Sequence, residues 1–302
     1  MQRILVFRSG ALGDFLLTVP ILEALRKAHV HSSITLLTRS AYGEFLVERS
    51  LVDEFRNMES ADWAGLFSDH PSLPPGAGEW LSSFAKVFVW MTDADGCFFR
   101  NLRKFCRAEI HRMNPIVNPA GIHATDQLAG VLPQANEFVF HSHQSVSSRA
   151  LALHFGSGSK SKNWPIAHWK SFLNILASMH PGLPLLIISG EADACERAAL
   201  LPTVQCLPNP ITMADNWRLA RLARQLSECA AYVGHDTGVS HLAALCSVPS
   251  LWLFGPTDPS VWAPRRPNVH PVQSDLENLE PMDVWARVQL LMATPTSRRS
   301  GL

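Results

Sequence analysis

Residues 232–245 read YVGHDTGVSHLAAL, a pattern that predicts a strand, a tight turn and a helix in succession. Asp236 or Thr237 would cap the helix, and Gly238 leaves room beside its first turn. Free N–H groups and the positive end of the helix dipole suit such a turn to a phosphate or a carboxylate. An ordinary capped helix is equally compatible with this stretch.

The same alternation of short apolar runs and helical patterns extends along the whole chain. It predicts parallel sheets with helices on both faces, an α/β fold class. Strands are expected at 4–7, 34–38, 51–55, 86–90, 108–112, 150–155, 184–189, 203–207, 232–234 and 249–254. Helices are expected at 15–27, 98–106, 165–178, 193–200, 216–227, with Asp215 or Asn216 as its cap, and 281–293.

The polar segment 141–148 reads as a linker between two repeats of this pattern. We therefore predict a first domain over 1–145 and a second over 146–280, followed by a terminal helix and tail over 281–302. The 302 residues carry 26 basic and 26 acidic side chains, which argues against a nucleic-acid partner. Six cysteines without a C-x-x-C pair indicate free thiols in a reducing compartment, so a cytoplasmic protein is expected.

Four loops rich in small residues follow predicted strands, at 8–14, 156–163, 190–196 and 234–238. Ligands of open parallel sheets bind at the carboxyl ends of strands. Lys160 and Lys162 add ammonium groups to one of these loops, which would suit a diphosphate, although a solvated basic loop would look the same.

Two aspartate motifs in the first half allow two interpretations each. Asp14 follows Gly13 at a predicted helix start, where it either complements the helix dipole or acts as a general base. Asp93 and Asp95 form an Asp-x-Asp, which either binds a divalent metal or caps a turn. The two-part architecture favours the turn, and the histidines lack zinc-site spacing, so we expect no metal.

Several segments together resemble glycosyltransferase family 9, the ADP-heptose:lipopolysaccharide heptosyltransferases. The matching segments are 4–14, 17–20, 154–158, 162–165, 236–244 and 254–259. The resemblance implies a GT-B fold, in which two Rossmann-like domains with parallel sheets face each other across a cleft and the last helix crosses back to the first domain. It also implies inverting transfer of a sugar, heptose from ADP-heptose, onto a lipopolysaccharide core or related surface glycan, without a metal or other cofactor.

The resemblance places the catalytic base on Asp14, and we assign Gly13, Asp93 and Asp95 to the acceptor side. The acid that holds the ribose would follow Gly190, where Glu191 and Glu196 compete and Glu196 is preferred. The residues assigned to the donor and its phosphates are Ser157, Lys162, Asp236, Thr237, Gly238, Val239 and His241.

The expected partners are therefore a nucleotide-sugar donor and a glycan or glycolipid acceptor. The resemblance further implies a monomer at the cytoplasmic face of the inner membrane, with peripheral membrane contact. Two alternatives remain open: another GT-B enzyme such as a nucleotide-sugar 2-epimerase, and a non-catalytic protein that binds sugar nucleotides.

Overall fold

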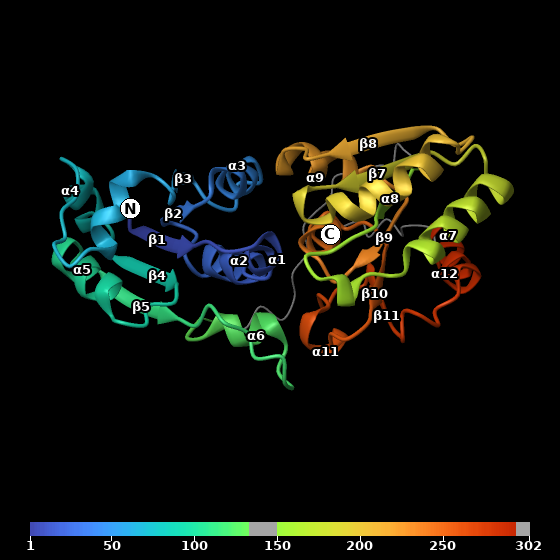
Figure 1. Ribbon diagram of the computed structural model, residues 1–302. Helices are drawn as coiled ribbons and strands as arrows, with labels where there is room; N and C mark the ends of the chain where they lie inside the picture. The colour runs from blue at the N-terminus through green and yellow to red at the C-terminus, as the bar shows by residue number, and fades with distance from the viewer. Residues whose placement is uncertain (133–149, 294–302) are drawn as a thin grey trace, which may run out of the picture. The chain divides into compact units, whose positions relative to one another are not determined.

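The computed structural model describes residues 1–132 and 150–293, which belong to two compact α/β units (Figure 1). The predicted linker at 141–148, the boundary between 145 and 146, and the tail from 294 lie outside the described residues. Within the described ranges, no helix combines the length and apolar character that crossing a membrane would need.

The first unit is built on a parallel sheet of five strands in the order β3-β2-β1-β4-β5. Its central strand β1 is buried because it pairs with strands on both sides and carries an apolar run, Ile4 to Phe7, with no exposed surface. The strands are β1 (Arg3–Arg8), β2 (Ser33–Thr38), β3 (Glu54–Asn57), β4 (Lys86–Trp90) and β5 (Glu109–Met113).

The helices of the first unit differ from the prediction near the N-terminus, where two helices replace one. They are α1 (Leu12–Leu16), α2 (Val19–Ala28), α3 (Ser40–Glu48), η1 (Ala61–Phe67), α4 (Ala77–Ser82), α5 (Cys97–Phe105) and α6 (Ala124–Ala129). The predicted helix at 15–27 is two helices, because Pro20 occupies the first turn of α2, where its missing N–H costs nothing. Gly13 and Asp14 consequently lie inside α1 rather than in a loop.

The strand predicted at 51–55 begins three residues later, as β3. Leu51 and Val52 are buried in the turn that precedes the strand, so their apolar character misled the prediction. The helix α3 was not predicted. The strands at β4 and β5 and the helix α5 match their predicted positions within one residue at either end.

The second unit has a parallel sheet of six strands in the order β11-β10-β9-β6-β7-β8. Its strands are β6 (Leu151–His154), β7 (Leu185–Ser189), β8 (Ile211–Asp215), β9 (Ala231–His235), β10 (Ser250–Phe254) and β11 (Val269–Gln273). Its helices are η2 (Lys160–Lys162), α7 (Ile166–Met179), η3 (Glu191–Asp193), α8 (Ala194–Gln205), α9 (Leu219–Ser227), α10 (Gly238–Leu245), α11 (Pro259–Trp262) and α12 (Pro281–Ala293).

Two predictions for the second unit are wrong. Residues 203–207 do not form a strand, because α8 continues to Gln205; Leu200 and Val204, four residues apart, are both buried on one face of that helix. The strand is β8 instead. The helix α9 has Arg218 at its N-cap position without a side-chain cap, whereas Asp215 ends β8 and Asn216 has a φ of 51°.

The helix α12 covers the residues predicted for the last helix, 281–293. It packs against α7, and Val284, Trp285 and Val288 belong to the core of the second unit. That the terminal segment crosses back to the first domain stays a prediction, as do the predicted domain boundaries.

Candidate functional site

The turn between β9 and α10 has the predicted strand–turn–helix geometry. Thr237 is the N-cap, and its Oγ1 accepts a hydrogen bond from the amide of Ser240 at 3.4 Å. The hydroxyls of Tyr232 and Ser240 lie 2.8 Å apart, an approach that requires Gly234, since a Cβ there would come within 2.2 Å of the Tyr232 hydroxyl oxygen. The first N–H groups of α10, at Gly238 and Val239, therefore start from a fixed turn.

Lys162 and Asp236 form an ion pair beside this turn. The Lys162 ammonium lies 2.8 Å from the Asp236 carboxylate, whose side chain is 6% exposed against 29% for the lysine. The Nε2 of His241 lies 3.9 Å from the other oxygen of Asp236, and its ring packs edge-on against Trp252. The structure thus brings together Lys162, Asp236 and His241, three of the residues that the sequence assigned to the nucleotide-sugar donor.

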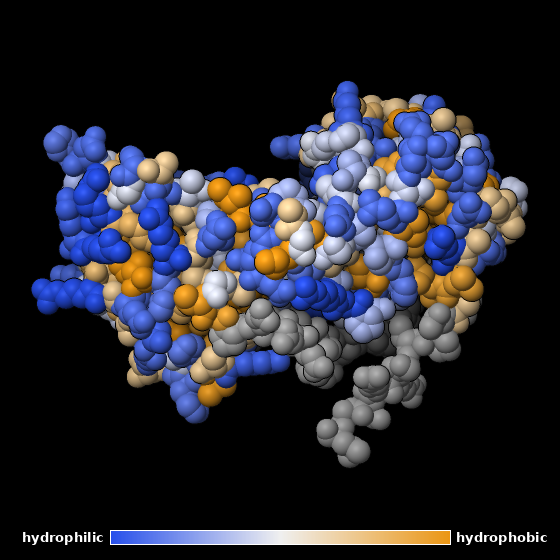
Figure 2. All heavy atoms as spheres, turned by 90° about the horizontal axis from the view of Figure 1, so that it is seen from below, coloured by the Kyte–Doolittle hydropathy of each residue, from blue (hydrophilic) through white to orange (hydrophobic). Residues whose placement is uncertain are grey.

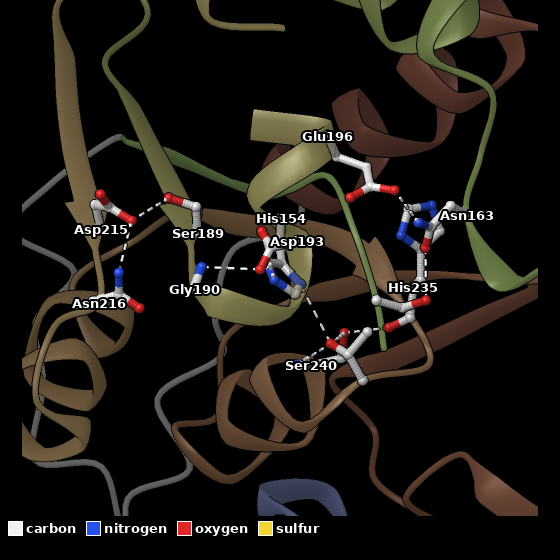
Figure 3. A network of polar contacts seen from close by, with 12 residues as sticks. His154, Asn163, Ser189, Gly190, Asp193, Glu196, Asp215, Asn216, His235 and Ser240 are labelled. Atoms are coloured by element: carbon white, nitrogen blue, oxygen red, sulfur yellow. Dashed lines mark hydrogen bonds and ion pairs between the residues drawn. The ribbon is translucent and has the colours of Figure 1, made fainter. Parts of the chain in front are cut away.

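A second set of contacts ties the 156–163 loop to α8. The Asn163 amide donates to Glu196 Oε1 at 2.9 Å (Figure 3), and the Ser157 hydroxyl lies 2.6 Å from Asn163 Oδ1. Glu196 is half-buried and faces this loop, whereas Glu191 is exposed in η3. The hydroxyl of Ser157 also contacts the backbone of its own loop, so in this structure it stabilises the loop.

Asp193 is a polar residue of the site that the sequence prediction missed. Its carboxylate caps η3 by accepting from the Gly190 amide at 2.9 Å, and it pairs with His154, whose Nε2 is 3.5 Å away (Figure 3). Burial raises the pKa of Asp193, yet the hydrogen bonds that its carboxylate accepts from His154 and from the Gly190 amide keep that pKa below its ordinary value. The Gly-x-x-Asp spacing after β7, typical of a capped turn, was the available signal.

His235 belongs to the framework behind this site. Its Nε2 accepts from the Trp164 amide at 2.8 Å, and its ring packs edge-on against Trp169. Complete burial lowers the pKa of His235 to about 3, and the neighbouring His154 contributes a smaller lowering. A neutral imidazole at this place holds the start of the 164–179 segment against β9.

The first unit presents Asp14 at the carboxyl end of β1. Asp14 is exposed in the first turn of α1, and its carbonyl accepts from the buried guanidinium of Arg8. Burial lowers the pKa of Arg8 to about 10, partly offset by the charge of Asp14. Gly10, at a φ of 125°, lets the loop turn beside Asp14, and Tyr42 donates to its carbonyl at 3.2 Å. The buried Arg8 thus fixes the backbone position of Asp14.

Asp93 and Asp95 cap α5 rather than standing free. The two oxygens of Asp93 accept from the amides of Phe98 and Phe99 at 3.1 and 3.0 Å, and Asp95 accepts from Cys97 at 3.0 Å. The Asp-x-Asp motif is therefore explained by helix capping. Among residues 1–132 and 150–293, no group of three or more His, Cys, Asp or Glu side chains is placed to hold a metal ion.

A pocket of about 380 Å³ lies at the carboxyl ends of β4 and β5, next to Asp93. Its walls are mainly apolar, with Met91, Met113 and Ile116, and Arg112 stands at its edge, stacked on Phe99. Figure 2 shows hydrophobic residues scattered among hydrophilic ones on the visible face of the first unit. Large exposed hydrophobics of this unit include Phe67, Ile116, Ile122 and Val131.

Comparisons with known proteins identify the family of the chain. Residues 123–286, more than half of the chain, match glycosyltransferase family 9 (heptosyltransferase), and the chain belongs to that family. The recognition of the family from its motifs is thereby confirmed.

Individual members of the family share low sequence identity with this chain or match only part of it. Lipopolysaccharide heptosyltransferase 1 of Pseudomonas aeruginosa is 33% identical over 147 residues, which are 48% of this chain but 36% of that protein. The chain thus spans well under two thirds of that relative. A glycosyltransferase of family 9 from Veillonella parvula has a TM-score of 0.73 at 16% identity and covers 96% of this chain and 97% of its own.

The E. coli heptosyltransferase WaaC, solved with ADP, has a TM-score of 0.72 at 17% identity and covers 96% of this chain and all of its own. Identities this low show the fold alone. The predicted fold class, two Rossmann-like units of the GT-B type, is confirmed.

Proposed function

We propose that the protein transfers a sugar from a nucleoside diphosphate sugar, with ADP-heptose as donor and a lipopolysaccharide core or related surface glycan as acceptor. The observation that carries this proposal is the Lys162–Asp236 ion pair at the N-terminus of α10. An ammonium group and free helix N–H groups at one place suit a diphosphate, because both contribute positive charge. Family membership, and ADP in the WaaC structure, support the choice of nucleotide and sugar.

The donor would be held by the second unit. The amides of Gly238 and Val239 and the ammonium of Lys162 would neutralise the diphosphate, whose charge grows as the bond to the sugar breaks. Glu196, half-buried on α8, would accept from the ribose hydroxyls through the oxygen that Asn163 does not use. Asp236 and His241 would keep the lysine in place before the donor arrives.

Asp14 would act as the general base. An acceptor hydroxyl has a high pKa, so removal of its proton during attack on the anomeric carbon lowers the barrier. The hydroxyl proton passes to the Asp14 carboxylate, the new bond forms at the anomeric carbon, and the nucleoside diphosphate leaves with the electrons of the old bond. A single displacement of this kind inverts the anomeric configuration and needs no metal. The protein would act as a monomer at the cytoplasmic face of the inner membrane.

Calorimetric titration with ADP-, UDP-, GDP- and dTDP-sugars tests the proposal. ADP-heptose should bind more tightly than the other donors, and incubation with a glycan acceptor should release ADP. Turnover should persist in EDTA. Preference for a UDP-sugar, with a change of the sugar itself and no transfer, would instead indicate an epimerase. Binding without turnover of any kind would indicate a non-catalytic protein.

A further inference from the structure

A chain of polar contacts runs behind the proposed diphosphate site, from η3 through the end of β6 to the cap of α10. Asp193 Oδ2 lies 3.5 Å from His154 Nε2, and His154 Nδ1 lies 3.3 Å from the Thr237 hydroxyl. Figure 3 shows His154 and Asp193 close together in the centre of the network. Three segments that are separate in the sequence are thus linked by side-chain contacts, in addition to the backbone pairing of β6 with β7 and β9.

The members of this chain are buried, so their hydrogen bonds have to be satisfied within the protein. Asp193 is 3% exposed, His154 4%, and Tyr232 and Ser240 have no exposed surface. The close packing is enforced at Gly156, where a Cβ would lie 2.3 Å from the Cβ of Asp193. A buried carboxylate without a donor would be costly, and His154 supplies that donor.

The direction of each hydrogen bond in this series of contacts follows from the carboxylate of Asp193 at its end. A carboxylate only accepts, so the Nε2 of His154 must carry the proton that it directs at Asp193. In the neutral Nε2–H tautomer of the imidazole, Nδ1 carries a lone pair and can accept the hydroxyl proton of Thr237, 3.3 Å away. With its proton so directed, Thr237 offers a lone pair to the Ser240 amide, which is the capping bond of α10.

The hydrogen bonds of the neighbouring Ser240 and Tyr232 hydroxyls have directions compatible with this arrangement. Ser240 donates its hydroxyl to the carbonyl of His235, so it accepts from the hydroxyl of Tyr232 at 2.8 Å. The Oγ of Ser240 also lies 3.3 Å from the Oγ1 of Thr237, the same distance as the Nδ1 of His154, but an unprotonated imidazole nitrogen is the stronger acceptor for the Thr237 proton. The orientation of the cap is therefore decided by His154 and, through it, by Asp193.

We propose that Asp193 and His154 are positioning residues for the diphosphate of the donor. By fixing the hydroxyl of Thr237, they hold the first turn of α10 in the geometry that directs the amides of Gly238 and Val239 at the phosphates. This inference rests on the proposed function, because the diphosphate is its ligand. Neither residue touches the diphosphate itself.

Asp193→Asn is the decisive variant, because it preserves shape and reverses polarity. The asparagine oxygen can still accept from the Gly190 amide, while its NH2 group faces His154 as a donor. The Nε2 of His154 must then accept, the proton moves to Nδ1, and Nδ1–H donates to Thr237. The hydroxyl of Thr237 then loses His154 as its acceptor and has to turn its proton toward the Ser240 Oγ, 3.3 Å away, so the cap of α10 loosens without a change in packing.

Nitrogen-15 NMR of the histidine side chains tests the order of protons without any reference to activity. The signals of His154, identified by their loss in His154→Gln, should show the Nε2–H tautomer in the wild type and the Nδ1–H tautomer in Asp193→Asn. The wild-type measurement does not depend on the stability of the Asp193 variant. An Nδ1–H tautomer in the wild type, or no change in the variant, would overturn the inference.

A double-mutant cycle on ADP binding tests the consequence. Asp193→Asn should weaken ADP binding about tenfold when Thr237 is present, the size of one lost charge-assisted contact, and less than about twofold in Thr237→Val. Asp215→Asn is the matched control, because Asp215 ends the strand β8 and pairs with Arg197 and Ser189. It should leave ADP binding within about twofold of the wild type.

The outcomes separate this inference from the proposed function. Equal weakening in both Thr237 backgrounds, or none in either, while the wild type binds ADP, would overturn the positioning role and leave the proposed function standing. A wild type that fails to bind ADP would overturn the proposed function, and the NMR result would still decide the orientation of His154. Thermal unfolding of each variant checks that the fold is retained.

Discussion

The carboxyl edges of the two sheets present their charged groups in opposite ways. In the second unit, Lys162 and Asp236 are already paired with each other, and Asp193 with His154. In the first unit, Asp14 is exposed on α1, and its backbone carbonyl accepts a hydrogen bond from the buried Arg8. Groups that bind a charged ligand gain from being fixed in advance, whereas a group that takes a proton has to be accessible. The difference suits the second unit to binding and the first to proton transfer.

Loss of Asp14 should produce the largest effect. Asp14→Asn should lower the rate of sugar transfer by about 10²–10⁴-fold, the usual contribution of a general base. Its free energy of unfolding should change by less than about 0.5 kcal/mol, because the side chain is exposed. A steady-state assay of ADP release and a urea titration measure the two quantities.

Asp69→Asn is the control for this variant, since Asp69 is also an exposed aspartate of the first unit, 3.8 Å from Arg100. It should transfer sugar at the wild-type rate. Retention of activity in Asp14→Asn would remove the general base from the mechanism.

Removal of Lys162 should lower stability as well as donor binding. Lys162→Ala leaves the Asp236 carboxylate, 6% exposed, without its ammonium partner. We expect a loss of about 2–3 kcal/mol in the free energy of unfolding, less than for a fully buried pair because the lysine is partly exposed. The double variant Lys162→Ala with Asp236→Asn should recover most of that loss. A single variant as stable as the wild type would show that the ion pair contributes nothing to folding.

Much of this contrast could be predicted from the sequence. Apolar runs and glycine turns locate β1, β4, β9 and β10, because local patterns decide buried strands. The Thr237 cap and the pairing of its turn with Lys162 agree with the motif. The helix α8 could not be read correctly, since Pro202 and the β-branched Thr203 and Val204 favour a break that burial overrides.

The pairing of Asp193 with His154 was equally hidden. It depends on the end of β6 and the η3 segment after β7, which are adjacent only in the folded sheet, where β6 and β7 are neighbours. The burial of Arg8 beneath Asp14 is likewise a tertiary effect. Conversely, Asp93 and Asp95 matched a metal motif locally, yet their oxygens serve the amides of α5.

Two glycines of one loop offer a matched test of the packing behind the second site. Gly156→Ala should destabilise the protein by about 1–3 kcal/mol, because the new Cβ would meet the Cβ of Asp193 at 2.3 Å. Gly158→Ala, where no heavy atom lies within 4 Å of the new Cβ, should change stability by less than about 0.5 kcal/mol. Thermal or chemical unfolding distinguishes the two. Equal stabilities would mean that Asp193 can move away freely.

A gradual effect is expected in the dependence of stability on pH. The pKa of His235 is about 3 in the folded protein, against about 6.5 when unfolded, so the unfolded state binds one more proton between these values. Stability should therefore fall as the pH drops below about 6.5, by up to about 1.4 kcal/mol per pH unit from this group. His235→Gln should reduce that slope in urea titrations between pH 4 and 6.5. An unchanged slope would assign the dependence to other groups.

The division of roles between the two edges is tested most directly by the affinity for ADP of three proteins under one condition: the wild type, Asp14→Asn and Lys162→Ala. Asp14→Asn should bind ADP as tightly as the wild type, while Lys162→Ala should bind it about 10–100-fold more weakly. Equal weakening in both variants, or wild-type affinity in Lys162→Ala, would show that the two edges do not divide donor binding and proton transfer between them.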